Sequence, residues 1–256
     1  MKAVLLILGV VLAVALVALL ILAAGFSARI AQIEADLAAH PPRQARDDLP
    51  PMVRAFGERG MAGDRPGAAV RLTQAAEMRL KPGADWTPLD ARQVIAAPVS
   101  GFAWVAQMRI GPLPAVRVID SYADGAGLLE VRALGALRIG LSDGPDAALG
   151  EAMRYLAELP WVPDAILTNP EITWAETPDG VTARVETAGG PAEVTFTFDA
   201  AGDITEMRAA ARPTTLADGT AVTLPWIGRF EDYGEIGGRR IPRFGEIGYD
   251  YPDGYE

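Results

Sequence analysis

Polar and apolar side chains alternate residue by residue over most of the chain from residue 68 onward. In the first such segment the apolar positions are Val70, Leu72, Met78 and Leu80. Alternation with a period of two is typical of a β-strand that has one face in the core and one face in water. The same pattern returns in the segments 102–110, 181–186 and 193–198. We therefore expect half-buried antiparallel strands.

Turn residues separate these segments at short intervals. The following pairs each combine glycine with aspartate or with a second glycine: Asp124-Gly125, Asp179-Gly180, Gly202-Asp203, Asp218-Gly219 and Gly237-Gly238. Such residues tolerate the positive φ of tight hairpin turns. The spacing predicts a meander of about eight to ten strands. The expected fold class is mainly β (α+β): an N-terminal transmembrane helix followed by a curved antiparallel half-barrel sheet capped by a helix.

One segment interrupts the alternation with a helical period. Leu149, Met153 and Leu156 fall on one face of a helix, and Pro160 ends the pattern. An amphipathic helix must cover an apolar surface. We therefore expect residues 146–159 to form a lid helix over the concave face of the sheet.

The opposite face of this helix carries Glu151, Arg154 and Glu158. Charges at this spacing usually form a solvated helix face, and this is our interpretation for Glu151. Arg154 and Glu158 are flanked by Tyr155 and Trp161, on a helix with one side turned toward the sheet. We therefore predict that Arg154 and Glu158 orient the polar head group of a ligand.

Large aromatic side chains are spread along the chain, which contains 5 tryptophans and 6 tyrosines. Their ordinary role is to fill a core, but large aromatics on a concave sheet also suit the wall of an apolar cavity. For a ligand held beneath the lid helix, the predicted cavity walls are Trp104, Tyr122, Tyr155, Trp161 and Trp174.

Residues 3–26 contain no charged or strongly polar side chain. As a helix they span about 36 Å, which exceeds the roughly 30 Å hydrocarbon core of a bilayer. A cleaved signal peptide is the alternative, but its apolar stretch is usually about 7–15 residues long and ends at a small-x-small site, which is not evident here. We expect a retained single-pass anchor in the inner (cytoplasmic) membrane, with the lipid bilayer as its partner.

The helical period continues beyond the apolar run until Pro41 and Pro42 stop it. The chain is therefore predicted to have three parts: a transmembrane anchor at 1–26, a helical stalk and linker at 27–44, and an antiparallel β half-barrel domain at 45–256.

Charges beside the apolar run bear on its orientation. Lys2 precedes the run, whereas Arg29, Arg43 and Arg46 follow it, so the positive-inside rule leaves both orientations open. A very short N-terminal tail before a long apolar run is the usual layout of a signal anchor. On that layout we expect the globular domain on the periplasmic, extracytoplasmic side.

Composition excludes several kinds of chemistry. The chain has no cysteine and a single histidine, His40, so thiol catalysis, disulfides and cysteine or histidine zinc sites are excluded, and we predict no metal site and no cofactor. His40 stands beside the Pro-Pro break, and we interpret it as a surface residue. A formal net charge of −10 repels phosphate backbones, so nucleic acid is not an expected partner.

Residues 140–144 match the G-x-S-x-G string of a nucleophile elbow. We reject this interpretation because the elbow needs a parallel α/β sheet and a later histidine, and no histidine follows Ser142. The serine and the aspartate beside it are better explained as capping residues of the lid helix. With no catalytic set recognised, the sequence favours a binding protein over an enzyme.

Several strings resemble a bacterial family of membrane-anchored proteins that is catalogued as a domain of unknown function. They are Gly101–Ala106, Arg154–Glu158 with Trp161–Pro163, Phe196–Asp199 with Gly202, and Pro225-Trp226 with Asp232-Tyr233, Gly237-Gly238 and Ile241-Pro242. The resemblance covers residues 45–254 and implies architecture rather than an activity. Two features depart from the family: Tyr249 replaces a tryptophan, and relatives usually continue into one further strand, which puts the closing edge of the sheet in question.

At the level of fold, a curved antiparallel sheet capped by a helix is similar to the Lol-type half-barrels of bacterial lipoprotein carriers, which hold acyl chains in a concave apolar face. The expected function is therefore a membrane-anchored protein that binds a hydrophobic or amphipathic ligand, such as a lipid or a lipoprotein acyl chain. The alternatives are a carboxylate-dependent hydrolase, with Glu158 as first candidate, and a non-catalytic envelope scaffold that presents a sheet edge to a protein partner.

Overall fold

The computed structural model describes residues 1–79, 81–110, 113–216 and 218–256, so Leu80 of the first predicted strand lies outside the described residues. The helices are α1 (Lys2–Ala38), α2 (Pro51–Gly60), α3 (Pro145–Ala157) and α4 (Pro163–Thr168), with a 3-10 turn at Leu159–Trp161. The helix α3 takes the place of the expected lid helix.

Six strands form the first sheet in chain order, each antiparallel to its neighbour. They are β1 (Ala69–Met78), β2 (Thr87–Ala96), β3 (Phe102–Ile110), β4 (Leu113–Ala123), β5 (Ala126–Ala133) and β6 (Leu137–Ser142). Seven strands form the second sheet in the same way. They are β7 (Thr173–Thr177), β8 (Gly180–Thr187), β9 (Gly190–Phe198), β10 (Ile204–Thr215), β11 (Ala221–Ile236), β12 (Arg239–Tyr251) and β13 (Gly254–Tyr255).

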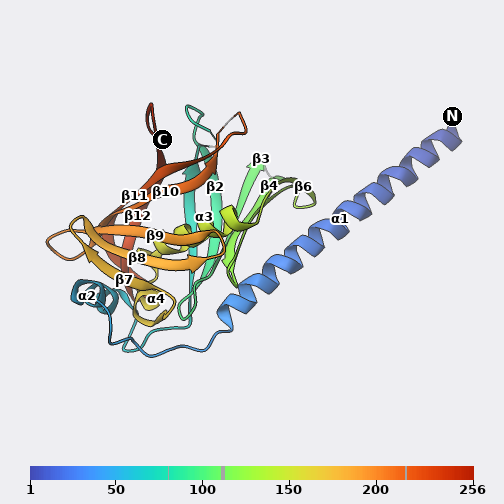
Figure 1. Cartoon of the computed structure of the whole chain (residues 1–256). Helices are drawn as coiled ribbons and strands as arrows, with labels where there is room; N and C mark the ends of the chain where they lie inside the picture. The colour runs from blue at the N-terminus through green and yellow to red at the C-terminus, as the bar shows by residue number, and fades with distance from the viewer. Residues whose placement is uncertain (80, 111–112, 217) are drawn as a thin grey trace.

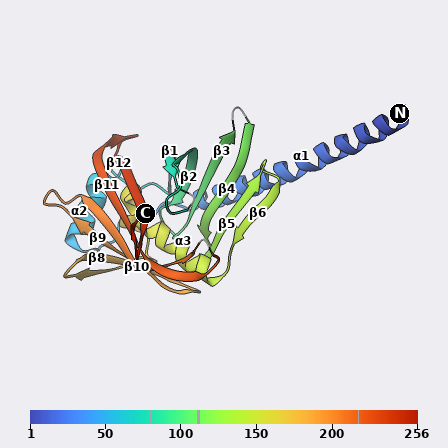
Figure 2. The same cartoon turned by 90° about the horizontal axis from the view of Figure 1, so that it is seen from above.

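The helix α3 lies in the space between the two sheets (Figures 1 and 2). It contacts β4 and β5 on one side and β8, β9 and β10 on the other. A close approach of its first turn is permitted by Gly127 of β5, where a Cβ would lie only 2.3 Å from the carbonyl oxygen of Ala147. One apolar core therefore joins the helix to both sheets.

The mainly β, antiparallel half-barrel class is confirmed, and alternation is visible in β1, where Val70 is buried and Arg71 is exposed. The predicted number of strands is wrong. Within the described residues, 13 strands form a six-stranded and a seven-stranded sheet that do not close into one barrel. The physical reason is the helical segment between β6 and β7, which separates the two meanders and occupies the space between them.

The helix α1 continues without interruption from the apolar run into the following polar turns, as the sequence predicted. In the described part of the chain it is the one helix that is long and apolar enough to cross a membrane. It is a candidate membrane anchor or signal sequence.

The last turns of α1 pack against the outer face of the first sheet (Figure 1). Two apolar clusters form there: Phe26 and Ile30 with Val105 and Ile119, and Leu37 with Val94, Ala96 and Ala103. The strand β3 is consequently buried on both faces. This explains why residues 102–106 are apolar at every position rather than at every second one.

An ion-pair network completes the contact between α1 and the sheet. Glu130 lies on the outer face of β5 with its side chain 0% exposed, and its carboxylate pairs with Arg29 of α1 at 2.8 Å and with Arg132 at 2.7 Å. A buried carboxylate costs several kcal/mol unless it is paired. The ion pairs therefore favour the docked position of the helix.

Ile30→Asp tests whether this docking stabilises the domain. Ile30 is 0% exposed, so an unpaired charge there should lower the free energy of unfolding by about 3–5 kcal/mol. Ala31→Asp places the same charge on the neighbouring exposed position and should change stability by less than about 0.5 kcal/mol. Denaturant unfolding of the full chain in detergent, followed by tryptophan fluorescence, measures both; equal effects would contradict the docking.

Candidate functional site

A row of polar side chains crosses the otherwise apolar inner face of the first sheet. The row consists of three successive cross-strand partners: Gln93 on β2, Trp104 on β3 and Asp120 on β4. The next partners on either side are apolar, Leu72 on β1 and Leu129 on β5. Because direct partners on antiparallel strands point to the same face, this polar row faces α3. It provides the sheet's contribution to the site.

The helix α3 turns its charged face toward this row. Glu151 and Glu158 are each only 7% exposed, and the Arg154 side chain is 17% exposed. The interpretation of Glu151 as part of a solvated helix face is therefore wrong. A helix enclosed between two sheets has no long side left for water, so its polar side chains must find partners in the interior.

Arg154 is the centre of these contacts. Its guanidinium forms ion pairs with Asp120 of β4 and, at 2.9 Å, with Glu158 one turn along the helix. It also lies over the rings of Trp104 at 4.8 Å and Phe102 at 5.1 Å. Burial lowers the pKa of Arg154, but the surrounding carboxylates outweigh burial and raise the pKa above its ordinary value. The guanidinium therefore stays charged.

A chain of hydrogen bonds extends from this centre along the sheet. Gln93 donates to Glu158 and accepts a hydrogen bond from Gln74 at 3.1 Å. The indole N–H of Trp104 donates to the side-chain oxygen of Gln74 at 2.8 Å. These side chains are thus held in place by partners rather than free to reorient.

Arg212 brings a second guanidinium from the other sheet. The pairing of β10 with β11 shifts between Ala209 and Arg212, which inserts one extra residue and turns the Arg212 side chain inward. Its Nη2 lies 3.5 Å from the Glu151 carboxylate, and its guanidinium lies 4.4 Å from the Trp226 ring centre. Arg212 could not be predicted from the sequence, because a period of two cannot reveal a bulge.

Tyr249 also contacts Arg212, which donates a hydrogen bond to the tyrosine hydroxyl. Tyr249 is the cross-strand partner of Trp226, and both rings lie beside the guanidinium. A tyrosine at this position therefore supplies a hydrogen-bond acceptor, which an indole would lack.

Glu151 and Asp120 share the middle of the site. Burial raises the pKa of Glu151 well above its ordinary value, and the neighbouring Asp120 carboxylate raises it further, against the opposing effect of Arg212. Among the described residues, neither Asp120 Oδ1 nor Glu151 Oε2 has a hydrogen-bond partner. We interpret the two as a carboxyl–carboxylate pair in which protonated Glu151 donates to Asp120. Asp120, Glu151, Arg154, Glu158 and Arg212 are called the charged cluster below.

The remaining residues predicted to bind a ligand lie in different surroundings. Tyr155 is 1% exposed, and its hydroxyl bonds to Asn169 at 2.9 Å, so the ring fills the core beneath α3. Trp161 donates to the carbonyl of Pro242 at 2.9 Å and packs on Phe230. Trp174 packs on Phe196 in the second sheet. Of the predicted ligand-binding residues, Arg154 and Glu158 belong to the charged cluster and Trp104 lies against it, whereas these three aromatics lie elsewhere.

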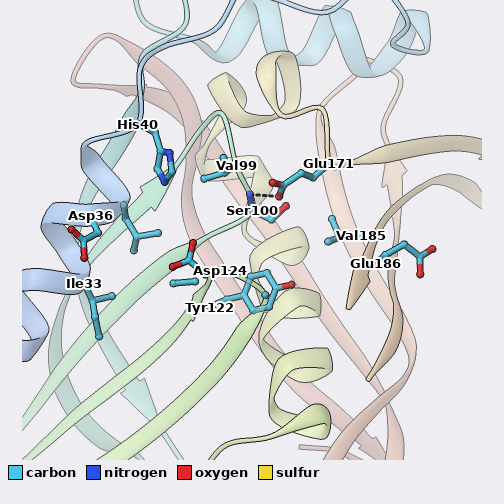
Figure 3. Close-up of a pocket in the computed structure, with 13 residues that line it drawn as sticks. Ile33, Asp36, His40, Val99, Ser100, Tyr122, Asp124, Glu171, Val185 and Glu186 are labelled. Atoms are coloured by element: carbon cyan, nitrogen blue, oxygen red, sulfur yellow. Dashed lines mark hydrogen bonds between the residues drawn. The ribbon is translucent and has the colours of Figure 1, made fainter. Parts of the chain in front are cut away.

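Tyr122 lines a separate cavity of about 530 Å³ at the C-terminal end of α1 (Figure 3). The walls come from that helix end, from the β2–β3 and β4–β5 connections, and from β8. Burial raises the pKa of Tyr122, and the charge of Glu171 raises it further. Glu171 also accepts a hydrogen bond from the backbone N–H of Ser100 at 2.7 Å.

The lining of this cavity is acidic. It includes Asp36, Asp124, Glu171 and Glu186 together with His40, and none of its described lining residues is a lysine or an arginine. Such a lining disfavours anionic groups, so we place no acyl carboxylate or phosphate there. In the described part of the chain, no group of three or more His, Cys, Asp or Glu side chains is arranged to hold a metal ion.

Apolar side chains beside the charged cluster remain partly exposed. They lie on the inner face of the first sheet, and they are Leu72, Met108, Val116, Leu129 and Val131. The site therefore combines a polar centre with an adjoining apolar surface.

Glu151→Gln tests the protonation of this pair. Because the folded protein holds the Glu151 proton more tightly than the unfolded chain, wild-type stability should fall, relative to the variant, as pH rises above the ordinary pKa of a glutamate, at about 4–5. Each tenfold difference in proton affinity between the folded and unfolded states changes the free energy of unfolding by about 1.4 kcal/mol, which corresponds to about 3–6 °C in Tm. Differential scanning calorimetry measures the trend. Glu176→Gln, at an exposed position, should show no such trend; matching trends would contradict the assignment.

Comparison with known proteins matches the chain to a family and to a solved structure. The structure is that of LolA superfamily protein NE2245 from Nitrosomonas europaea, with 9% sequence identity and a TM-score of 0.39 over 80% of this chain and 86% of that one. A comparison with curated proteins finds no match. The model of the family of unknown function DUF6544 matches residues 40–256, so the chain belongs to that family, as the sequence resemblance implied.

Proposed function

We propose that this protein is a membrane-tethered binder of an amphipathic ligand, such as a lipid or a lipoprotein acyl chain, held between its two sheets. The observation that carries the proposal is the row of partly exposed aliphatic side chains beside the charged cluster. A small number of fixed polar groups next to an apolar surface is the usual composition of a small-molecule site.

The tether in this proposal is α1. Residues 3–26 have the length and apolarity of a span, and the following turns dock on the outer face of the first sheet. We place the globular domain on the periplasmic side of the inner membrane. The division into a 1–26 anchor, a 27–44 stalk and a 45–256 half-barrel belongs to the same proposal.

The acyl portion would lie beside α3 rather than beneath it. Met153, Tyr155 and Leu156 are buried and fill the space beneath the helix. Met108, Val116 and Val131 lie further along the inner face and are only partly covered. These aliphatic side chains offer the contact that a hydrocarbon chain prefers, because burial of apolar area is favourable by about 25 cal/mol per Å².

The head group would lie at the charged cluster. The side chains of Arg154 and Arg212 keep 17% and 13% of their surface exposed, and a polar ligand atom would have to approach the two guanidinium groups through that remaining opening. Glu158 holds Arg154 in position, and Tyr249 and Trp226 hold Arg212. With Glu151 protonated, Asp120 and Glu158 balance the charges of Arg154 and Arg212, so the cluster suits an uncharged or zwitterionic polar head group rather than an additional anion.

Met108→Trp tests the acyl site. Native mass spectrometry of a fragment spanning residues 24–256, which keeps Phe26, Ile30 and Leu37, should detect bound lipid. Filling the inner face should weaken binding about tenfold, equivalent to about 1.4 kcal/mol. Arg109→Trp places the same ring on the adjacent exposed position of β3 and should leave binding unchanged. Lipid-free protein, or equal losses in the two variants, would count against the proposal.

A second candidate function is carboxylate-dependent hydrolysis, and the Asp120–Glu151 pair favours it. The reaction needs one acid that holds its proton beside one that is ionised, and the raised pKa of Glu151 favours it as the protonated acid. Glu158, the acid first considered, is instead paired with Arg154 and Gln93. The pair therefore replaces Glu158 as the candidate.

Turnover of ester and glycoside substrates by the purified chain tests this second candidate. Glu151→Gln removes the transferable proton while keeping a hydrogen-bond donor, and the rate should fall by about 10²–10⁴. Glu176→Gln should retain full activity. Absence of turnover across both substrate classes, or equal activity of the two variants, would remove the candidate.

A further inference from the structure

The hairpin formed by β5 and β6 exposes a concentration of large aliphatic side chains. Leu134, Leu137, Ile139 and Leu141 are 54%, 51%, 62% and 45% exposed, respectively. Single exposed aliphatic residues are common on soluble proteins, but four along one short edge hairpin, with Leu141 beside the outer-face Glu130 and Leu137 on the opposite face, call for a partner. We call these four residues the hairpin patch.

The strand β6 is an edge of the first sheet. Edge strands present unpaired backbone groups, and natural proteins usually protect them with charges, prolines or a covering segment. An edge strand with Leu137, Ile139 and Leu141 exposed is an aggregation hazard in water. The hairpin patch is therefore better suited to surroundings other than bulk water.

The hairpin turn retains a leucine where the backbone disfavours it. Leu134 has φ +54°, and Gly135 beside it has φ +67°. Left-handed backbone costs a residue with a Cβ about 1–2 kcal/mol, so glycine, asparagine or aspartate is usual at such positions. The presence of leucine indicates that its exposed side chain serves a purpose other than folding.

The hairpin lies beside the end of the apolar run of α1 (Figure 1). A Cβ atom added to Gly135 would lie 3.9 Å from the Cβ of Ala23, so the two backbones are close. The guanidinium of Arg132 stacks over the ring of Phe26, 4.3 Å from its centre. Ala23 precedes the end of the apolar run at residue 26 by about 4.5 Å along the helix axis. The turn is thus at the level where a bilayer around α1 meets water.

Arginines accompany the hairpin patch at this level. Arg138 lies within β6 and is exposed, and the Arg29 side chain on α1 is 51% exposed. Arg117 donates to the hydroxyl of Ser27 at 2.7 Å. Aliphatic side chains next to arginines suit the interface of a membrane, where the former reach the acyl region and the latter contact lipid phosphates.

We infer that the β5–β6 hairpin is a membrane-docking element, with the hairpin patch inserted into the head-group region of the same bilayer that α1 crosses. This inference rests on the membrane anchoring included in the proposed function. Contact at both α1 and the hairpin holds the first sheet at a defined angle to the membrane. The insertion is shallow, about 5–10 Å, because unpaired backbone groups of an edge strand do not enter hydrocarbon.

Spin labelling tests the inference directly, because the chain has no cysteine and each introduced one is unique. Ile139→Cys, Ile247→Cys and Leu12→Cys variants of the full chain are labelled and placed in nanodiscs of phosphatidylethanolamine and phosphatidylglycerol. Ile247, on β12, is 49% exposed and serves as the matched control for Ile139. Leu12 lies in the middle of the apolar run. Collision rates of each label with oxygen and with a water-soluble nickel chelate report its depth.

The label at Ile139 is expected to collide several-fold less often with the nickel chelate, and more often with oxygen, than the label at Ile247. The label at Leu12 is expected to be the least accessible to nickel and the most accessible to oxygen. If Leu12 is deep and Ile139 matches Ile247, the anchor stands and hairpin docking is overturned. If Leu12 itself is accessible to nickel, the anchoring of the proposed function fails as well. If the labels at Ile139 of two protein molecules come close together, and more so at a higher ratio of protein to lipid, a second copy pairs along β6. That result also overturns the inference.

Discussion

The charge balance around Arg154 is the interaction on which the rest of the structure depends. Most of α3 is enclosed between the two sheets, so the charges of Glu151 and Arg154 must be compensated in the interior. Asp120 from the first sheet and Glu158 from the helix itself pair with Arg154, and Arg212 approaches Glu151 from the second sheet. Leaving one such partner unpaired costs about 3–5 kcal/mol, which disfavours other registers of α3 against either sheet.

The second constraint is the docking of α1 on the outer face of the first sheet. Phe26, Ile30 and Leu37 convert the end of an apolar helix into part of the domain's core. The position of the domain relative to that helix is therefore set by packing rather than by a linker. The inner face of the same sheet carries the polar row, so the sheet connects the proposed anchor on one face with the proposed ligand site on the other.

The sequence predicted local structure well where one physical signal dominated. Alternation at Val70 and its neighbours identified strands, and the spacing of Leu149, Met153 and Leu156 identified α3. It failed where a residue's surroundings come from distant segments. Glu151 has the spacing of a solvated helix face and is buried only because the second sheet folds over it. Arg212 points inward only because β10 contains a bulge.

The sequence by itself determined the mainly β class, the apolar helix and the family, because hydropathy periods and turn residues act over a few neighbouring positions. Only the tertiary structure decided that the strands form two sheets, that α3 lies between them, and that five charged side chains meet there. Those outcomes depend on desolvation and charge pairing between segments far apart in the chain, and no local pattern of residues encodes them.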